Sequence, residues 1–302
     1  MEKNQFSKFQ LQKTGKIISP TDKLSCLLFN AEISDFEAVI ENHRAGIKSP
    51  VEITYGNEGE NLAPFEGAIL FAAISEQAAG NAVTTLGRIF HILGGGRDLR
   101  DAPKLKNAIA EALRKLRHTD IRVDITALAQ KYKGYAKNAA DLGFNPNKSL
   151  IIEGALLPSK TITAEVNGKI TEGVIQFLGD SPLLTIAKTK KQFTEFSPSL
   201  LAAPVRCTEQ TIAIKGYLLA RILKIKGSHA ENRKKRVRKL NKAILFDTLF
   251  SQCGLDVDSK WKRQDYRKTT AQILDHFITE KFIKSYQFTK QDGKFHSIEI
   301  DF

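Results

Sequence analysis

The C-terminal end of the chain couples a long amphipathic helix pattern directly to a hairpin signal. Apolar residues recur at helical spacing over residues 261–281, with lysine and arginine on the opposite face. Two strand-like runs, 282–288 and 295–300, then flank Asp292-Gly293. An Asp-Gly pair between strands is typical of a two-residue hairpin turn. The sequence therefore predicts a helix followed by a β-hairpin at this end of the chain.

Two more helices are expected upstream of this pair. Apolar residues recur at helical spacing over residues 211–223 and again over 240–250. Three helices followed by a β-hairpin is the order of a winged-helix unit, in which the hairpin forms the wing. We therefore predict a winged-helix domain over residues 201–302.

An earlier part of the chain repeats this order without obvious identity between the residues of the two halves. The expected elements are helices within 64–73, 84–93 and 104–117, and strand-like runs at 120–125, 150–152, 161–166 and 173–177. Asn167-Gly168 is the expected turn between the last two runs. A first winged-helix domain is therefore predicted over residues 63–200, and the fold class is α+β with two winged-helix domains in tandem.

Residues 1–62 are expected to form a partly helical N-terminal segment that packs on the first domain or extends it. Within this segment the sequence predicts an acidic helix through residues 36–41 and an extended run at 51–55. We assign it no activity.

Positive charge is concentrated in the last third of the chain. The 302 residues carry a formal net charge of +13, and residues 206–302 hold 21 Lys and Arg against 11 Asp and Glu. A basic run lies within this third, at residues 233–242. Clustered cations gain affinity for nucleic acid by displacing counterions from phosphate. DNA is therefore the first partner to consider, with the C-terminal third as its main contact.

The predicted helix at 261–281 has the size and charge that reading duplex DNA requires. A helix is roughly 10–12 Å across with its side chains, which fits the major groove. Cations in its first two turns can grip phosphate, hydroxyl groups can hydrogen-bond to bases or backbone, and the hairpin adds cations at its tip. The candidate contacts in this domain are Lys260, Lys262, Arg263, Arg267, Lys268, Thr269, Thr270, Lys290 and Lys294.

Two other basic segments are further candidates for DNA contact. In the basic run these are Arg233, Lys234, Lys235, Arg236, Arg238 and Lys239, and on the helix of the first domain they are Lys104, Lys106, Arg114, Lys115 and Arg117. Each segment has a plainer interpretation, because residues 104–117 can form an ordinary solvated helix face and residues 233–242 a flexible linker. Trp261, Tyr266 and Phe277 are interpreted as core side chains in preference to base-stacking platforms.

The sequence shows no pattern for catalysis, metal binding or membrane insertion. Gly94-Gly95-Gly96 is interpreted as a turn, because no phosphate-loop pattern follows it. The six histidines and three cysteines lack metal-ligand spacing. No apolar stretch approaches a membrane span, and no secretory signal begins the chain. We expect a cytoplasmic protein that is not an enzyme and that uses no cofactor or metal.

These patterns together resemble a known family. The residues that carry the resemblance are Pro64-Phe65-Glu66-Gly67-Ala68-Ile69-Leu70 continuing through residues 80–85, the helix-strand step at 104–125, and the helix and wing from Tyr266 to Phe302. Over most of residues 64–302 the chain is similar to the plasmid replication initiators with tandem winged-helix domains. The basic run at 233–242 has no counterpart that we can map on that pattern.

The resemblance implies a protein without nuclease or ATPase activity that binds origin repeats in double-stranded DNA and promotes origin opening. It implies that the second domain reads the major groove while the first grips DNA backbone or forms a homodimer. Host initiator and replicative helicase proteins are the other implied partners. A winged-helix transcriptional regulator is the first alternative, since it uses the same fold but binds a single palindrome. A rolling-circle nicking enzyme is a disfavoured second alternative, because the histidines lack the paired spacing.

Overall fold

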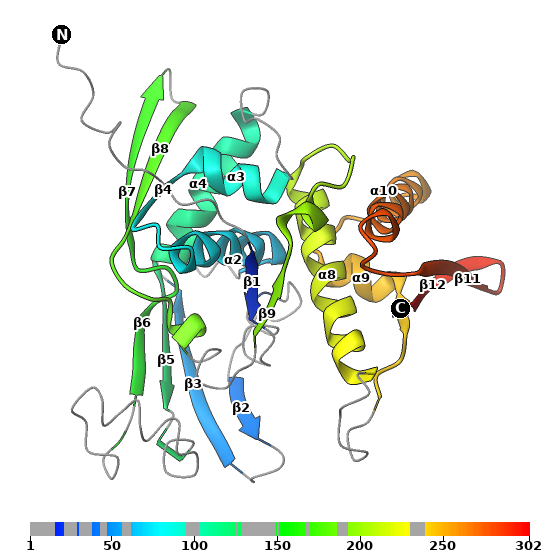
Figure 1. Cartoon of the computed structure of the whole chain (residues 1–302), viewed down its shortest axis with the longest axis horizontal. Coiled ribbons are helices and arrows are strands. Elements are labelled where there is room, and N and C mark those ends of the chain that lie inside the picture. The colour runs from blue at the N-terminus through cyan, green and yellow to red at the C-terminus, as the bar shows by residue number, and fades with distance from the viewer. Residues whose placement is uncertain are drawn as a thin grey trace.

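The chain folds into helices and small antiparallel sheets, which is the α+β class expected from the sequence (Figure 1). The computed structural model describes residues 16–20, 29, 38–42, 47–55, 62–94, 103–124, 126–127, 149, 151–166, 169–185, 193–229 and 239–302. In the described part of the chain, no helix is both long enough and apolar enough to cross a bilayer.

The first unit has the order helix, strand, helix, helix, strand, strand, with two further strands (Thr119–Asp124 and Ile151–Ala155) between its last helix and its hairpin that belong to another sheet. Its elements are α2 (Pro64–Ala78), β4 (Val83–Thr85), α3 (Leu86–Gly94), α4 (Pro103–Arg117), β7 (Ser159–Val166) and β8 (Lys169–Phe177). The strands form one antiparallel sheet in the order β4-β8-β7. Residues 84–85 were expected to open the second helix, but they belong to β4 because Thr84 and Thr85 pair with Ile175 and Val174 of β8.

The second unit repeats this order. Its elements are α8 (Glu209–His229), β10 (Ala243–Leu245), α9 (Phe246–Gln252), α10 (Lys260–Thr279), β11 (Ser285–Gln291) and β12 (Lys294–Asp301). The sheet order is β10-β12-β11, so the short strand again pairs with the second strand of the hairpin. The predicted helix over 240–250 is therefore wrong for residues 240–245: α9 begins at Phe246, and residues 243–245 pair with β12 instead.

The hairpin turn of the second unit is the one that the sequence predicts. Asp292 and Gly293 have φ values of 51° and 72°. A two-residue hairpin turn with both central residues in this left-handed region matches the twist of the strands it joins. The Asp-Gly prediction is confirmed, whereas Asn167-Gly168 lies outside the described residues.

The N-terminal segment and the residues after α4 contribute further strands. A four-stranded antiparallel sheet has the order β2 (Ala38–Asn42), β3 (Ile47–Tyr55), β5 (Thr119–Asp124) and β6 (Ile151–Ala155). A separate pair joins β1 (Ile17–Pro20) to β9 (Phe193–Phe196), which precedes the short 3-10 helix η3 (Pro198–Leu201). The extended run at 51–55 is confirmed, but the acidic helix at 36–41 is wrong, because residues 38–42 pair with β3.

A buried polar cluster holds α2 against the turn and helix that follow it. The carboxylate of Glu76 is 1% exposed and accepts from Arg88 Nε at 2.6 Å and Nη2 at 2.9 Å. It also accepts from the hydroxyl of Thr84 at 2.9 Å and the amide of Asn81 at 3.3 Å. Burying a carboxylate is costly unless it is paired and hydrogen-bonded, and here both conditions are met.

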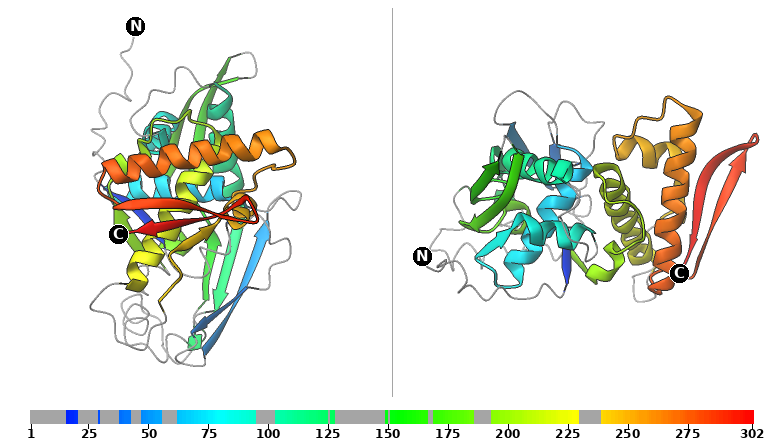
Figure 2. Two further views of the ribbon diagram at one scale, coloured as in Figure 1. Left: turned by 90° about the vertical axis from the view of Figure 1, so that its right-hand side faces the viewer. Right: turned by 90° about the horizontal axis from the view of Figure 1, so that it is seen from above.

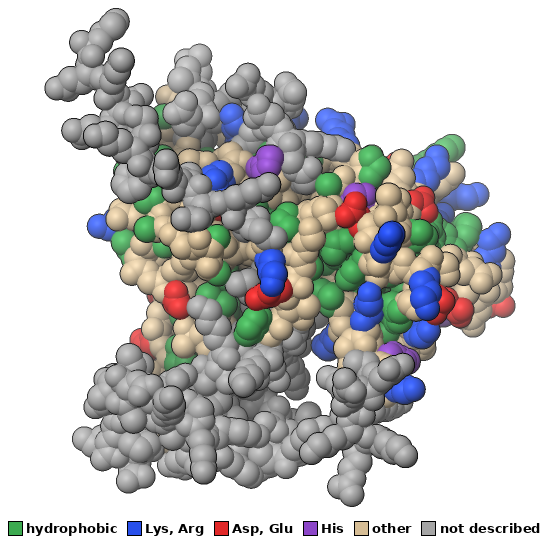
Figure 3. Space-filling view, viewed as in Figure 1, with side chains coloured by type: hydrophobic (Ala, Val, Ile, Leu, Met, Phe, Trp, Pro, Cys, Tyr) green, Lys and Arg blue, Asp and Glu red, His purple; other side chains and the backbone are tan. Residues whose placement is uncertain are grey.

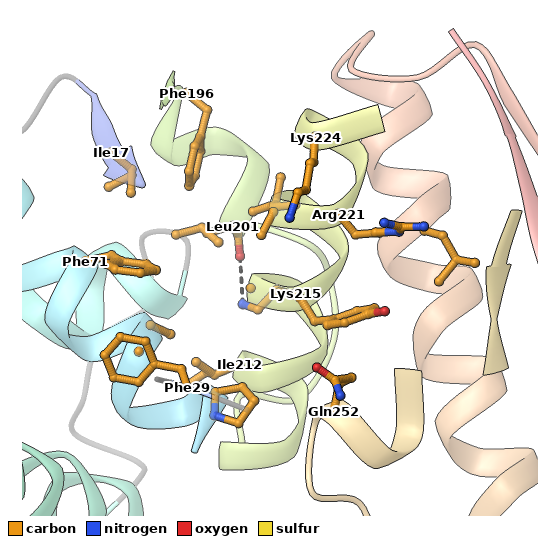
Figure 4. Close-up of a pocket in the computed structure, with 18 of the residues that line it drawn as sticks. Ile17, Phe29, Phe71, Phe196, Leu201, Ile212, Lys215, Arg221, Lys224 and Gln252 are labelled. Carbon is orange, nitrogen blue, oxygen red and sulfur yellow. Dashed lines mark hydrogen bonds between the residues drawn. The ribbon is translucent and has the colours of Figure 1, made fainter. Parts of the chain in front are cut away.

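Helix α8 packs on α2 of the first unit, and its buried lysine adds hydrogen bonds to two further elements. Lys215 is 2% exposed, and its Nζ donates to the carbonyl oxygens of Leu93 in α3 and Leu201 in η3, both at 2.8 Å. Figure 4 shows the bond to Leu201 beside an apolar cavity of about 630 Å³. The last carbonyls of a helix lack partners within the helix and carry partial negative charge. The ammonium therefore links the ends of α3 and η3 to α8.

Candidate nucleic-acid interface

Helix α10 presents an exposed basic face because its other face is fixed in the core of the second unit. Ser259 caps the helix, with its hydroxyl accepting from the backbone N–H of Lys262 at 3.1 Å. Ile273, Leu274 and Phe277 are fully buried. Figure 2 shows α10 and the β11–β12 hairpin lying together on one side of the molecule. The core therefore holds one face of α10, and the first two turns of the helix are exposed to solvent.

The candidate cations of α10 lie in these two turns. Lys260, Lys262, Arg263 and Lys268 are exposed, and Arg267 is partly buried. Several Lys and Arg side chains are visible over the second unit in Figure 3. The structure thus brings the five predicted cations of this helix onto one end of α10.

Two of these cations are oriented by the loop before the helix. Lys262 forms an ion pair with Asp256, and this hydrogen bond raises the pKa of the lysine and lowers the pKa of the aspartate. Arg263 donates through Nε to the backbone carbonyl of Val257 at 2.9 Å. Both groups are on the surface, so the contacts position the side chains without adding much stability.

The hairpin contacts α10 at two places: the hydroxyl of Tyr286 donates to Asp275 Oδ1 at 2.9 Å, and Phe295 brings cations of the helix and the hairpin together. The guanidinium carbon of Arg267 lies 4.9 Å from the centre of the Phe295 ring, and the ammonium of Lys290 lies at the same distance. The edge of the ring also meets Phe288, with centroids 6.1 Å apart. Burial, with a smaller contribution from nearby Arg263, lowers the pKa of Arg267. The cations of helix and hairpin therefore meet at one aromatic ring.

The sequence did not single out Phe295 as part of the site. It is 41% exposed although it stands on a strand, and it faces the helix that carries the predicted contacts. In the sequence, only its position next to Lys294 and close to the turn indicated a role at this site. Lys290 and Lys294 are both exposed near the tip of the hairpin, as a contact role requires.

The two candidate threonines are placed differently from the cations. Thr270 is 0% exposed, and its hydroxyl donates to the carbonyl of Tyr266 one turn earlier at 2.8 Å. We therefore correct its assignment, because a hydroxyl in the core cannot reach DNA. Thr269 is half-buried at the border of the exposed face.

The three aromatic residues that were assigned to the core do not all lie there. Phe277 is fully buried, so that interpretation is confirmed, and Tyr266 is half-buried against Phe250 with centroids 6.0 Å apart. Burial raises the pKa of the Tyr266 hydroxyl. Trp261 is 80% exposed, so its assignment to the core is wrong. It lies in the first turn of α10, ahead of the part of the helix that the core covers.

The basic run is only partly described. Arg233, Lys234, Lys235, Arg236 and Arg238 lie outside the described residues, and Lys239 is exposed. Lys242 pairs with Asp301 at 3.1 Å and lies 5.3 Å from the centre of the Phe302 ring. The described end of the run is thus held against the C-terminal strand.

On α4 the predicted cations have acidic or polar neighbours. Arg114 pairs with Glu111 at 2.5 Å, which lowers the pKa of that carboxyl, and Lys115 lies 3.6 Å from Glu66. Arg117 hydrogen-bonds to the ring of His118 at 3.2 Å. Lys104 is exposed and Lys106 half-buried. Two of the five predicted cations of α4 therefore have a carboxylate beside them, from Glu111 on the same helix and from Glu66 on α2.

Comparison with known proteins gives weak similarity to solved structures. No protein-family model matches it, and no curated protein matches it. A solved structure of RctB domains 2-3 has 13% identity and a TM-score of 0.46, covering 92% of this chain and 95% of that one. A selenomethionine derivative of domain 2 and domain 3 of RctB has 13% identity and a TM-score of 0.41, covering 93% and 96%. We base neither fold nor function on similarity of this degree.

Proposed function

We propose that the chain is a sequence-specific double-stranded DNA-binding protein that initiates DNA replication. In this proposal both units are winged-helix domains, and the second contacts DNA through α10 and the β11–β12 hairpin. The proposal is supported by the repeated order of elements and by the short strand that pairs with the hairpin in each unit.

One observation carries the DNA-binding part of the proposal. The cations of the first two turns of α10 are continuous with those of the hairpin, because Arg267 and Lys290 both lie 4.9 Å from the centre of the Phe295 ring. A duplex offers a groove wide enough for a helix, bordered by phosphates on both sides. The arrangement suits a helix inserted in the major groove with the hairpin over the neighbouring backbone.

The arginine and lysine side chains suit different contacts with DNA. Arg263 and Arg267 can donate two parallel hydrogen bonds to a guanine edge, the commonest specific contact in the major groove. Lysines, as flexible point charges, suit phosphate, and each phosphate they neutralise steepens the salt dependence of binding by about 0.9. Base contacts would then determine sequence, and the lysines on helix and hairpin would supply affinity.

The finer parts of the proposal follow the resemblance to plasmid initiators described above. The protein would bind origin repeats, promote opening of the adjacent duplex without catalytic chemistry of its own, and recruit a host initiator and a replicative helicase. The first unit would grip DNA backbone or form a homodimer. This activity requires a cytoplasmic protein.

Selection of bound fragments from the replicon that encodes the protein, followed by footprinting, tests the proposal. We expect protection of several direct repeats spaced by one or two helical turns, at both low and physiological salt. A single protected palindrome would favour a transcriptional regulator instead. Equal binding to all fragments would refute sequence-specific recognition.

A further inference from the structure

The one tryptophan of the chain stands at the start of the candidate DNA-binding helix. Trp261 is the second residue of α10, and its side chain is the most exposed of the large hydrophobic residues described, at 80%. Leaving an indole in water forgoes the free energy gained by burying large apolar surface. The packing of the second unit does not explain this position, since the buried residues of α10 begin only at Thr270.

The surroundings of the indole indicate an anionic partner. Lys260 and Lys262 flank it in the sequence, Arg263 follows in the same turn, and all three are exposed. Asp256 pairs with Lys262 and Asp265 lies one turn further on, but over residues 260–268 five cations stand against the single acid Asp265. An apolar protein surface covering Trp261 would also have to desolvate these cations, which is costly without opposite charge. A DNA duplex covers the ring and supplies phosphates for the cations in one contact.

The chemistry of the major groove limits which groups of DNA the indole can contact. Base edges there present hydrogen-bond donors and acceptors, and the one apolar group they display is the 5-methyl group of thymine. An indole has a single N–H donor, so most of its surface can be matched only by an apolar group. We propose that Trp261 is a specificity-determining residue that packs on thymine methyl groups. This inference rests on the proposed function, because it requires α10 to enter the major groove.

Replacing thymine with uracil removes only the methyl group and therefore tests the contact. The probe is a labelled duplex recovered in the selection above, together with copies carrying uracil at one thymine position at a time. At the contacted position we expect the wild-type protein to lose about fourfold in affinity, the factor that corresponds to burying one methyl-sized group. Trp261→Ala should bind the thymine duplex about tenfold more weakly and should no longer distinguish uracil from thymine there.

Further variants and the intrinsic fluorescence complete the test. Trp261→Phe should keep part of the discrimination, and Ile162→Ala, which removes an exposed apolar side chain from β7 (68% exposed), should keep all of it. Because Trp261 is the single fluorophore of its type, its emission should also change when duplex is added. Normal binding with equal affinity for uracil and thymine copies, or unaltered discrimination in Trp261→Ala, would overturn this inference alone. Failure to select any duplex would overturn the proposed function as well.

Discussion

Helices α4 and α10 occupy the same place in their two units, but they carry their positive charge differently. On α4, Arg114 pairs with Glu111 and Lys115 with Glu66. On α10 the described residues provide an acid partner for Lys262, in Asp256, but no ion pair for Lys260 or Lys268. A basic helix can therefore be a solvated surface in one unit and a candidate DNA contact in the other. What distinguishes them is which acids the fold places beside the cations.

The hairpins of the two units also differ in the charges that surround them. On β11–β12, Phe295 joins the cations of helix and hairpin in one surface. Between α4 and β7, a cavity of about 440 Å³ has both signs of charge in its wall, including Glu111, Arg114 and Glu165. The predictions that follow test the link between the two units and whether this difference determines DNA binding.

The largest expected effect concerns the lysine that joins the units being compared. Lys215→Met keeps the length of the side chain but removes the donor for the carbonyls of Leu93 and Leu201. An unsatisfied buried polar group costs about 1–3 kcal/mol, so the free energy of unfolding should fall by about 2–4 kcal/mol. Chemical denaturation followed by circular dichroism measures this. Lys224→Met, an exposed change on the same helix, is the matched control; equal losses in both variants would contradict a special role for Lys215.

The direct comparison between the two helices uses single arginines. Arg263→Ala and Arg267→Ala should each weaken specific DNA binding by about 1–3 kcal/mol if they make bidentate base contacts. Arg114→Ala on α4 should change it by less than about 0.5 kcal/mol, because its charge is already offset by Glu111. Fluorescence anisotropy with the selected duplex gives the three affinities. A larger loss for Arg114→Ala than for the other two would reverse the roles of the units.

The basic run before β10 tests a contact that should not depend on sequence. Neutralising Lys234 and Lys235 together should reduce the slope of log affinity against log salt concentration by about two, since each phosphate contact contributes about 0.9. The affinity for specific and random duplexes should fall by a similar factor. Titrations at several salt concentrations measure the slope. Loss of affinity for one sequence alone would indicate a base contact instead.

A smaller effect is expected for the ring that joins helix and hairpin. Phe295→Ala should lower DNA affinity about fivefold, because the hairpin would lose its two cation–π contacts, each worth about 0.5–1 kcal/mol at an exposed site. Phe295→Leu keeps apolar bulk but not the ring and separates the two contributions. If both variants bind like the wild type, the Phe295 ring does not couple the hairpin to α10 for DNA binding.

The smallest effect is expected from freeing a cation on α4. Glu111→Gln removes the carboxylate that pairs with Arg114, so binding to random duplex at low salt should rise about twofold. Gel shifts at two salt concentrations are sufficient to see it, and the gain should disappear at the higher one. A decrease in affinity would show that the pairing with Glu111 orients Arg114 for contact with DNA, instead of offsetting its positive charge.

Parts of the candidate site could have been read more accurately from the sequence. Thr270 lies three and four residues before Ile273 and Leu274, on the same helical stripe, and this spacing already places it in the core. Trp261 offers no such signal, because periodicity does not show where along a helix the covering elements end. The same applies to residues 243–245, since a three-residue strand is too short to display its own period.

Features that depend on neighbours along the chain can be predicted from residue order alone: the basic amphipathic helix at 260–279, the Asp292-Gly293 turn and the excess of positive charge in the last third. The packing of the elements determines that Glu66 stands beside Lys115, that Phe295 meets Arg267, and that Lys215 bridges α3 and η3. Helical periodicity and turn geometry are local properties of the backbone, so they can be read from residue spacing. Contacts between residues that are distant in sequence depend on how the elements pack, so they cannot be predicted from residue spacing along the chain.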